Sequence, residues 1–330
     1  MPTLLERVAA RETRAVSRAL TLAENADTAF LSALDAAWPT LPQPQRIGIT
    51  GPPGAGKSTL TDALVAGLRA RGSRVAVVAV DPSSPFTGGA LLGDRLRMAR
   101  HTLDPDVFVR SMASRGHFGG LAAGTEDACD VLAQAGFDPV LVETVGVGQS
   151  EVEIARLADT TLVVLTPASG DSVQALKAGL MEAADVVVIN KADRPGAERM
   201  EEDVREALSL RPHPPAGQPL WLPPVVRTVA TEGTGTEATL GAIAAHQAHL
   251  VQHGLLQQAR AARAERRLAE LAAEALRASL LLPGPARDKL DQLRAQVAQG
   301  RLSPRAAAAE LVQALGLRAG AATRPATSGA

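Results

Sequence analysis

The 330-residue chain contains a single cysteine, Cys129, and this scarcity excludes several kinds of site. One cysteine cannot form an internal disulfide, and it cannot supply the thiolate set of a structural metal site. Cys129 falls within a predicted helix near residues 126–134, where we expect it to be a small core residue. The sequence also lacks any apolar run of about 18 residues, so we expect no helix that spans a membrane.

The chain has almost no net charge and very few lysines. It contains 35 acidic and 34 basic residues, so its composition gives no reason to expect nucleic acid or an anionic membrane as a partner. The basic residues are almost all arginine, and the only lysines are Lys57, Lys177, Lys191 and Lys289. In such a chain a lysine indicates a position where guanidinium serves poorly, although Lys177 can also be a solvated helix lysine.

The remaining composition, with 46% hydrophobic residues, is typical of a soluble intracellular enzyme, and we expect a cytoplasmic protein. Residues 1–26 mix Glu and Arg with Ala and Leu, a pattern that predicts an amphipathic helix rather than a signal peptide. We divide the chain into a helical extension (1–44), a nucleotide-binding domain (45–250), a C-terminal helical region (251–318) and a disordered tail (319–330).

Strands alternate with helices through the central part of the sequence. The predicted strands are Ile47–Thr50, Arg74–Val80, Val107–Ser111, Pro139–Glu143, Thr160–Leu165, Val186–Ile189 and Val225–Val229. Several are continuous apolar runs, which are typical of strands buried on both faces of a parallel sheet. The predicted fold is therefore α/β, a doubly wound and mostly parallel sheet with helical N- and C-terminal extensions.

A complete phosphate-binding loop follows the first predicted strand. Its residues are Gly51, Pro52, Pro53, Gly54, Ala55, Gly56, Lys57 and Ser58, and a predicted helix begins at Thr59. The glycines let successive backbone N–H groups converge on a phosphate, and the helix N-terminus adds partial positive charge. Lys57 can reach the β- and γ-phosphates, and the hydroxyl of Ser58 can bind Mg²⁺. The chain is therefore predicted to be a P-loop NTPase.

A second motif, Asn190-Lys191-Ala192-Asp193, indicates which base is bound. It follows a buried strand, and Asp193 can accept hydrogen bonds from N1–H and the exocyclic amine of guanine. Adenine lacks that pair of donors, so a carboxylate at this place discriminates strongly against it. The sequence therefore predicts a GTPase that binds GTP and GDP.

Three carboxylates lie between the two motifs. Asp81 and Glu143 end predicted strands, and Asp94 follows in Gly93-Asp94-Arg95. Since ligands bind beyond the carboxyl ends of parallel strands, we expect these groups near Mg²⁺ together with Ser58, although each can instead cap a helix or turn.

Gly146 and Gly148 follow Glu143, in a segment that we expect to reorganise with the γ-phosphate. Small GTPases commonly carry Asp-x-x-Gly-Gln here, whereas Gln149 of this chain lies further on. We therefore expect slow intrinsic hydrolysis.

Four motifs together resemble the MeaB/ArgK family of GTPases. They are Gly-Pro-Pro-Gly-Ala-Gly-Lys-Ser, Val-Asp-Pro-Ser-Ser-Pro-Phe-Thr-Gly-Gly, Glu-Thr-Val-Gly-Val-Gly-Gln-Ser-Glu and Asn-Lys-Ala-Asp, in this order. The resemblance covers roughly residues 10–280. It implies a homodimeric G-protein chaperone of an adenosylcobalamin-dependent acyl-CoA mutase, chiefly methylmalonyl-CoA mutase, that gates cofactor loading and protects the mutase.

The resemblance also implies roles for single residues. Gly51 to Thr59 would hold the phosphates, and Asn190, Lys191 and Asp193 would read guanine. The catalytic set would be Lys57, Glu143, Asp171, Gln174 and Lys177, of which the last three match a switch that contacts the mutase. Val229 and Ala230 stand where many GTPases have Ser-Ala behind the base, so a serine contact is expected to be lost. The C-terminal helices would serve dimerisation.

Two alternatives remain open on the sequence alone. A metal-insertion GTPase would need a cluster of cysteine or histidine ligands. His246, His249 and His253 fall on one face of a predicted helix, where a polar face is the competing interpretation. A small-molecule kinase, linked to amino-acid transport, would need a second substrate pocket with a general base, and the sequence identifies none.

Overall fold

The structure is a computed structural model that describes residues 2–81, 98–101, 103–113, 122–144, 150–167, 180–211 and 219–317. It forms two compact units, Met1–Glu265 and Arg266–Ala330, each of which is described by itself. The predicted tail at 319–330 lies outside the described residues.

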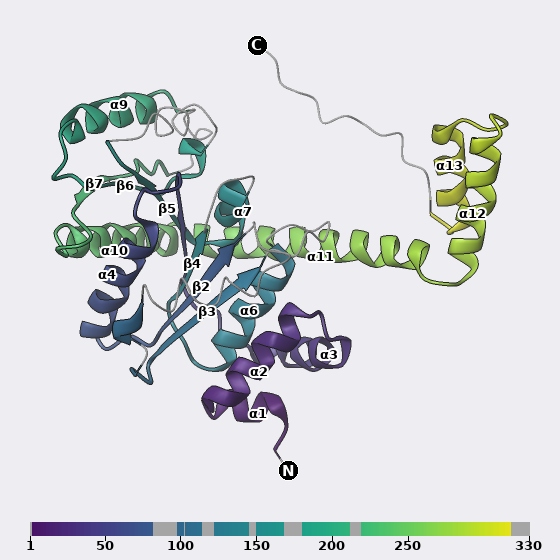
Figure 1. The fold of residues 1–330 in the computed structure, drawn as a ribbon, viewed down its shortest axis with the longest axis horizontal. Coiled ribbons are helices and arrows are strands. Elements are labelled where there is room, and N and C mark those ends of the chain that lie inside the picture. The colour runs from purple at the N-terminus through teal and green to yellow at the C-terminus, as the bar shows by residue number, and fades with distance from the viewer. Residues whose placement is uncertain are drawn as a thin grey trace. The chain divides into compact units, whose positions relative to one another are not determined.

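The first unit is built on a seven-stranded sheet within the described residues (Figure 1). Its strands are β1 (Arg46–Thr50), β2 (Val75–Asp81), β3 (Val107–Ala113), β4 (Val140–Thr144), β5 (Thr160–Leu165), β6 (Val186–Asn190) and β7 (Val225–Thr228). The order is β3-β2-β4-β1-β5-β6-β7, and all of these neighbours pair in parallel. Each predicted strand is present, and the predicted α/β fold is confirmed.

The strand order places the phosphate-binding loop where successive strands change from one side of β1 to the other. From β1 the chain crosses to β2 on one side, and from β4 it crosses to β5 on the other. In open α/β sheets, ligands bind beyond the carboxyl ends of the strands at such a switch point.

Helices cover both faces of the sheet (Figure 1). One face carries α4 (Lys57–Ala70) and α10 (Thr236–Gln252), and the other carries α6 (Ala122–Gln134), α7 (Ser150–Leu157) and α9 (Ala197–Ser209). Residues along a strand alternate between the two faces: Val77 belongs to the α4 side and Val78 to the α6 side. Both faces are apolar, which is why these strands read as continuous hydrophobic runs.

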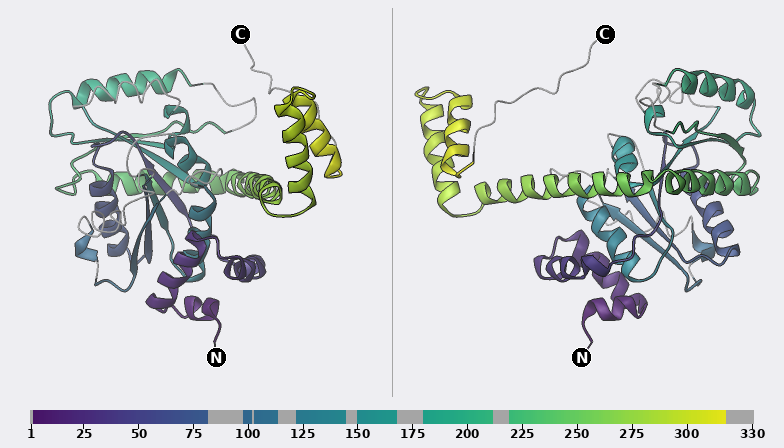
Figure 2. Two further views of the ribbon diagram at one scale, coloured as in Figure 1. Left: turned by 45° about the vertical axis from the view of Figure 1, so that its right-hand side comes forward. Right: turned by 180° about the vertical axis from the view of Figure 1, so that it is seen from behind.

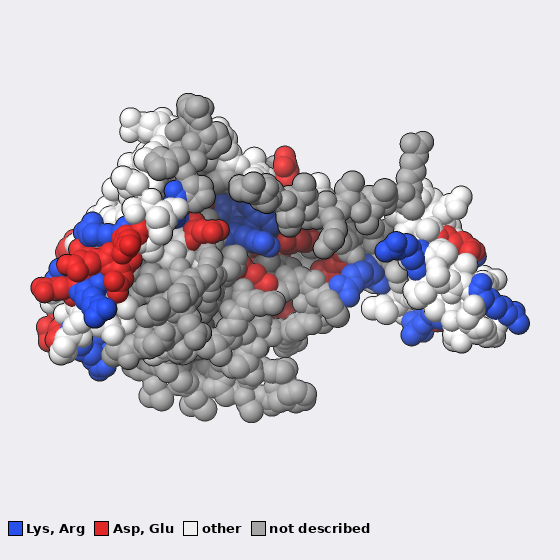
Figure 3. All heavy atoms as spheres, turned by 90° about the horizontal axis from the view of Figure 1, so that it is seen from above, with Lys and Arg blue, Asp and Glu red and all other residues white. Residues whose placement is uncertain are grey.

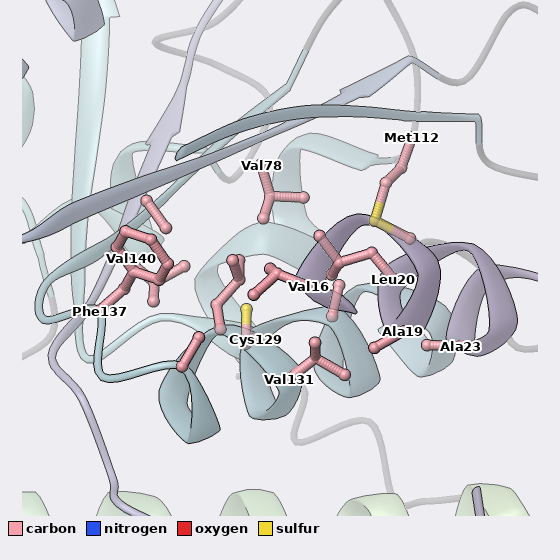
Figure 4. Packing of buried hydrophobic residues seen from close by; sticks show 14 of the residues in the cluster. Val16, Ala19, Leu20, Ala23, Val78, Met112, Cys129, Val131, Phe137 and Val140 are labelled. Atoms are coloured by element: carbon pink, nitrogen blue, oxygen red, sulfur yellow. The ribbon is translucent and has the colours of Figure 1, made fainter. Parts of the chain in front are cut away.

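Three N-terminal helices enlarge the core on the α6 side. They are α1 (Leu4–Ala9), α2 (Thr13–Glu24) and α3 (Thr28–Ala37), and the short helix η1 (Trp38–Thr40) leads into β1. Two further short helices are η2 (Ala99–His101) and η3 (Met181–Ala183). The views in Figure 2 show these N-terminal helices beside α6, on which α2 packs. In Figure 4, Val16 and Leu20 of α2 lie against Cys129 and Val131 of α6.

The environment of Cys129 confirms its predicted place in the core. The side chain is fully buried, and burial raises the pKa of the thiol to about 11. A thiol with so high a pKa stays protonated at neutral pH and is a poor nucleophile.

The second unit is a small helical assembly. It contains the later turns of α11 (Leu255–Leu281), followed by α12 (Pro285–Ala298) and α13 (Pro304–Ala314). Leu293, Ala307 and Leu311 form its buried core. Gly284 is the N-cap of α12, and Pro285 is its first residue, a position that suits proline because its missing N–H would have no partner there.

None of the helices described is both long enough and apolar enough to cross a bilayer. Among the described residues on the face shown in Figure 3, acidic and basic side chains lie beside one another.

Candidate functional site

The phosphate-binding loop has the backbone that its glycines predict. It leaves β1 at Thr50, curls through residues 51–56 and enters α4 at Lys57 rather than at Thr59. Gly51, Gly54 and Gly56 all have positive φ. A Cβ on Gly51 would come within 2.1 Å of the carbonyl oxygen of Val164, so no other residue fits there.

Lys57 lies inside this curve and is almost completely buried. Its Nζ donates to the carbonyl oxygens of Gly51, at 2.7 Å, and Pro52, at 3.1 Å. The ammonium is therefore held between the loop and the N-terminus of α4, where partial positive charge from the helix adds to its own. This is the arrangement needed to bind a phosphate chain as a compact point charge.

Two of the predicted oxygen ligands of Mg²⁺, Ser58 and Glu143, come together beside the phosphate-binding loop. The hydroxyl of Ser58 donates to Oε1 of Glu143 at 2.5 Å, and the side chain of Glu143 is buried at the end of β4. The register that pairs Ile49 with Glu143 brings the carboxylate beside the start of the loop. A hydroxyl and a buried carboxylate are hard oxygen donors, which suit Mg²⁺ better than a softer metal.

The other predicted magnesium ligands are placed only in part. Asp81 ends β2, where Ala79 pairs with Glu143, so its backbone lies at the same edge of the sheet. Its side chain and the whole of Asp94 lie outside the described residues. Three members of the expected catalytic set, Asp171, Gln174 and Lys177, also lie outside the described residues.

The base-reading motif is joined directly to the phosphate-binding loop. Asn190 ends β6, and its Nδ2 donates to the carbonyl oxygen of Ala55 at 2.9 Å. Lys191 adopts a left-handed backbone, with φ of 56°, and its Nζ donates to the carbonyl oxygen of Gly54 at 2.7 Å. Asp193 is exposed, which leaves its carboxylate accessible to a ligand.

The segment after β7 completes this corner, and one contact was not predicted. The hydroxyl of Thr228 donates to Oδ1 of Asn190 at 3.1 Å, and the N–H of Ala230 donates to the same atom at 3.2 Å. Val229 has no side-chain hydroxyl, and its N–H bonds to the carbonyl oxygen of Thr234. The sequence indicated the loss of a serine contact but not that Thr228 supplies a hydroxyl to Asn190 from the neighbouring position.

His246 and His249 of α10 and His253, which caps its C-terminus, form a chain of tilted ring contacts with Trp221. The ring of Trp221 lies 4.9 Å from that of His246 and 5.2 Å from that of His249, whose ring is 4.7 Å from that of His253. Among the residues that the structure describes, no group of three His, Cys, Asp or Glu side chains is placed to hold a metal ion. The described part of the chain therefore gives no support to a histidine metal site.

His246 also contacts a partly buried carboxyl group at the amino-terminal edge of the sheet. Its Nε2 lies 3.4 Å from Oδ1 of Asp185, and its Nδ1 lies 3.0 Å from the hydroxyl of Thr160. Burial raises the pKa of Asp185 to about 7 and lowers the pKa of His246 to about 4. Both shifts favour the neutral forms, because burial disfavours charge.

These opposite shifts predict a specific effect of pH on stability. The stability from Asp185 is complete below its ordinary pKa of 3.8 and is lost as pH rises through 7. The stability from His246 is complete above its ordinary pKa of 6.5 and is lost as pH falls through 4. Between pH 4 and 6.5 the two effects of pH on stability cancel in the wild type, because the pair binds one proton in both states of the chain. In the folded chain the proton is on Asp185, and in the unfolded chain it is on His246.

In Asp185→Asn the effect of His246 on stability should no longer be cancelled, so the free energy of unfolding should depend on pH. We expect the variant's free energy of unfolding, measured by urea titration, to drop relative to wild type by up to about 3 kcal/mol as pH falls from 6.5 to 4. Asp35→Asn, which changes an exposed carboxylate on α3, is the matched control. Parallel pH profiles for wild type and Asp185→Asn would show that the pair does not titrate in this way.

Comparison with known proteins agrees with this geometry. The family described as "Methylmalonyl Co-A mutase-associated GTPase MeaB" matches residues 16–282. A protein of Pyrococcus abyssi, named as a GTPase, is 49% identical over 263 residues, which cover 79% of this chain and 81% of the relative. The mouse protein "Methylmalonic aciduria type A homolog, mitochondrial" is 35% identical over 272 residues, covering 82% of this chain and 65% of that protein.

A solved structure gives the same result for the fold. The crystal structure titled "LAO/AO transport system kinase" is 30% identical, with a TM-score of 0.70, and covers 95% of this chain and 96% of that one. The phosphate-binding loop, the Asn-Lys-Ala-Asp corner and the relatives lead to one conclusion. The chain belongs to the MeaB family of P-loop GTPases, and its activity is the hydrolysis of GTP.

Proposed function

We propose that this GTPase is a chaperone of an adenosylcobalamin-dependent acyl-CoA mutase, with methylmalonyl-CoA mutase as the first candidate. The observation that carries the proposal is the family match over residues 16–282, whose description names association with that mutase. The mouse relative, named for methylmalonic aciduria, supports the same partner. In this role GTP binding and hydrolysis would gate cofactor loading and protect the mutase, and the cytoplasm is the proposed location.

We propose Ser58 and Glu143 as ligands of Mg²⁺ or of its bound waters, with Asp81 and Asp94 as further carboxylates. The pairing of Ser58 with the buried Glu143 supports this assignment. When bound, Mg²⁺ would neutralise charge on the β- and γ-phosphate oxygens. Lys57 would hold the same phosphates from the other side, where Gly51 and Pro52 now orient its ammonium.

Guanine selection is assigned to the corner formed by Asn190, Lys191 and Asp193. Asn190 links the loop carbonyl of Ala55 to Thr228, so it would fix the distance between the phosphate and base ends of the site. Asp193 would then accept the guanine N1–H and amine, as its exposure permits. Ala230 packs into the core beside this corner and would form part of the wall behind the base.

We further propose that the protein is a homodimer joined through its second unit. Several leucines of the later α11 turns are exposed, namely Leu268, Leu271, Leu276 and Leu281. Several exposed leucines on one helix are typical of a surface that another chain covers. A monomeric mass in analytical ultracentrifugation at micromolar concentration would contradict this part of the proposal.

The partner can be identified by affinity capture from an extract of the native cells. The bait is the full chain loaded either with a non-hydrolysable GTP analogue or with GDP. We expect an adenosylcobalamin-dependent mutase to be captured, in amounts that differ between the two nucleotides. The matched bait is Asp193→Asn, which should lose the nucleotide dependence because it binds guanine nucleotides poorly. Capture that yields no cobalamin enzyme with either nucleotide would contradict the chaperone role.

A further inference from the structure

One arginine joins α7 to the first turns of α11. Arg263 lies on α11 within the first unit and is almost completely buried. Its Nη1 donates to the carbonyl oxygen of Leu157, the last residue of α7. Its Nη2 donates to Oδ1 of Asp159 at 2.7 Å. A cation at the C-terminus of α7 also complements the negative end of the helix dipole.

Asp159 is the centre of this junction. Burial alone would raise its pKa, but hydrogen bonds and charge from Arg260 and Arg263 outweigh burial and hold the pKa below its ordinary value. Its Oδ2 accepts the backbone N–H of Arg46 at 3.0 Å, at the start of β1. The carboxylate therefore stays charged and connects α11 to the strand that feeds the phosphate-binding loop.

Arg260 makes a different attachment of the same helix. It bonds to Asp159 at 2.9 Å and to the carbonyl oxygens of Gln43 and Pro44, both at 3.2 Å. Among the described residues, the hydrogen bonds of Arg260 do not include α7. Arg260 thus anchors α11 to the segment before β1, whereas Arg263 alone of these two also holds the end of α7.

The opposite side of α7 lies directly on β1. A Cβ on Gly48 would come within 2.8 Å of Cγ2 of Ile154 and 3.0 Å of Cβ of Ala158, so the glycine permits this close approach. Packed elements so close together move as a unit rather than deform continuously. The N-terminal end of α7, at Ser150, follows Glu143 after a short segment that the sequence predicts to respond to the γ-phosphate.

We infer that Arg263 is a positioning residue that couples α7 to α11, so that the first turns of α11 report which guanine nucleotide is bound. A shift of α7 on exchange of GDP for GTP carries the carbonyl of Leu157 with it. Arg263 must then either move with α7 and keep its bond to Leu157, or stay with Asp159 and lose that bond. The bridge therefore has two discrete arrangements. The helix that carries Arg263 continues past Glu265 into the second unit.

The inference rests on GTP binding and needs no mutase. It is tested by hydrogen exchange of the full chain with magnesium and either GDP or a non-hydrolysable GTP analogue. In the wild type we expect exchange in residues 255–265 to differ between the nucleotides by about fivefold or more, as for a typical coupling between sites. Peptides from α7 should change together with them, because both ends of the Arg263 bridge move.

Arg263→Lys keeps the charge but replaces the two donor nitrogens, Nη1 and Nη2, by a single ammonium on a shorter stem, so it cannot reproduce the forked bridge to Leu157 and Asp159. We expect it to reduce the difference to less than about twofold, with guanine nucleotide affinity unchanged. Arg260→Lys, the matched control, should keep the wild-type difference because its contacts do not include α7.

Three results would overturn the inference. The nucleotide-dependent difference in exchange could survive in Arg263→Lys, or it could disappear in Arg260→Lys as fully as in Arg263→Lys. The third result needs no variant: wild-type chain that binds both nucleotides but shows the same exchange in residues 255–265 with each. A chain that binds neither nucleotide would instead contradict the GTPase assignment, so the two failures can be told apart.

Discussion

Asp193→Asn should weaken GTP binding by about a thousandfold or more, because a site built to receive a donor pair rejects a ligand it cannot pair with. The amide would place an N–H₂ group against the N1–H of guanine, leaving donors facing donors. Xanthine carries a ring carbonyl where guanine carries its amine, so the same variant should bind xanthine nucleotides better than wild type does.

The effect should be confined to the base because of how the corner is built. Asn190 and Lys191, not Asp193, make the contacts with the loop carbonyls of Ala55 and Gly54. The phosphate end of the site should therefore keep its geometry in the variant. Competition between labelled GDP and unlabelled GTP, ATP and XTP measures the change.

The matched control is Asp203→Asn, which removes one exposed carboxylate from α9. Its net charge is the same as that of Asp193→Asn. It should bind GTP as wild type does. Wild-type chain that binds ATP and GTP equally well, or a variant with unaltered preference, would contradict the assignment of Asp193.

Local sequence patterns were sufficient to predict the sheet and the loop. A buried parallel strand is a short apolar run, and all of the predicted runs, from Ile47–Thr50 to Val225–Val229, became strands. The glycines of the loop were equally informative, because positive φ at Gly51, Gly54 and Gly56 is a local requirement. Helix positions were less exact, since α4 begins at Lys57 rather than at Thr59.

Contacts between distant segments could not be predicted in the same way. The sequence places Thr228 far from Asn190, and only the pairing of β6 with β7 brings their side chains together. Likewise the sequence alone gives no reason for a glycine at position 48 of β1. The reason is the close packing of Ile154 and Ala158 on it. Arg263 is one of several arginines in its helix, and its burial follows from the position of Asp159 just before β5.

A client mutase should accelerate GTP hydrolysis by at least about tenfold, since a partner charge that completes a phosphoryl-transfer site can be worth far more. The reason lies in the segment after Glu143, where no glutamine stands at the usual water-positioning place. We expect the mutase to order the proposed switch that contains Lys177. Lys177→Ala should therefore keep the basal rate and lose most of the acceleration.

Lys57→Ala is the inactive control for the same assay. Removing the ammonium that Gly51 and Pro52 orient should abolish turnover with and without the mutase, because charge at the β/γ bridge is then unbalanced. Lys289→Ala, which changes an exposed ion pair with Glu310 in the second unit, should behave as wild type. If Lys177→Ala is stimulated as strongly as wild type, the switch assignment is wrong even if the mutase is the partner.

The most direct measurement of the proposed function is the steady-state rate of GTP hydrolysis by the wild-type chain, titrated with purified adenosylcobalamin-dependent methylmalonyl-CoA mutase from the same organism. The account predicts a slow basal rate that rises and saturates as mutase is added. A rate that stays constant up to a large excess of mutase, in a preparation that binds and hydrolyses GTP, would contradict it.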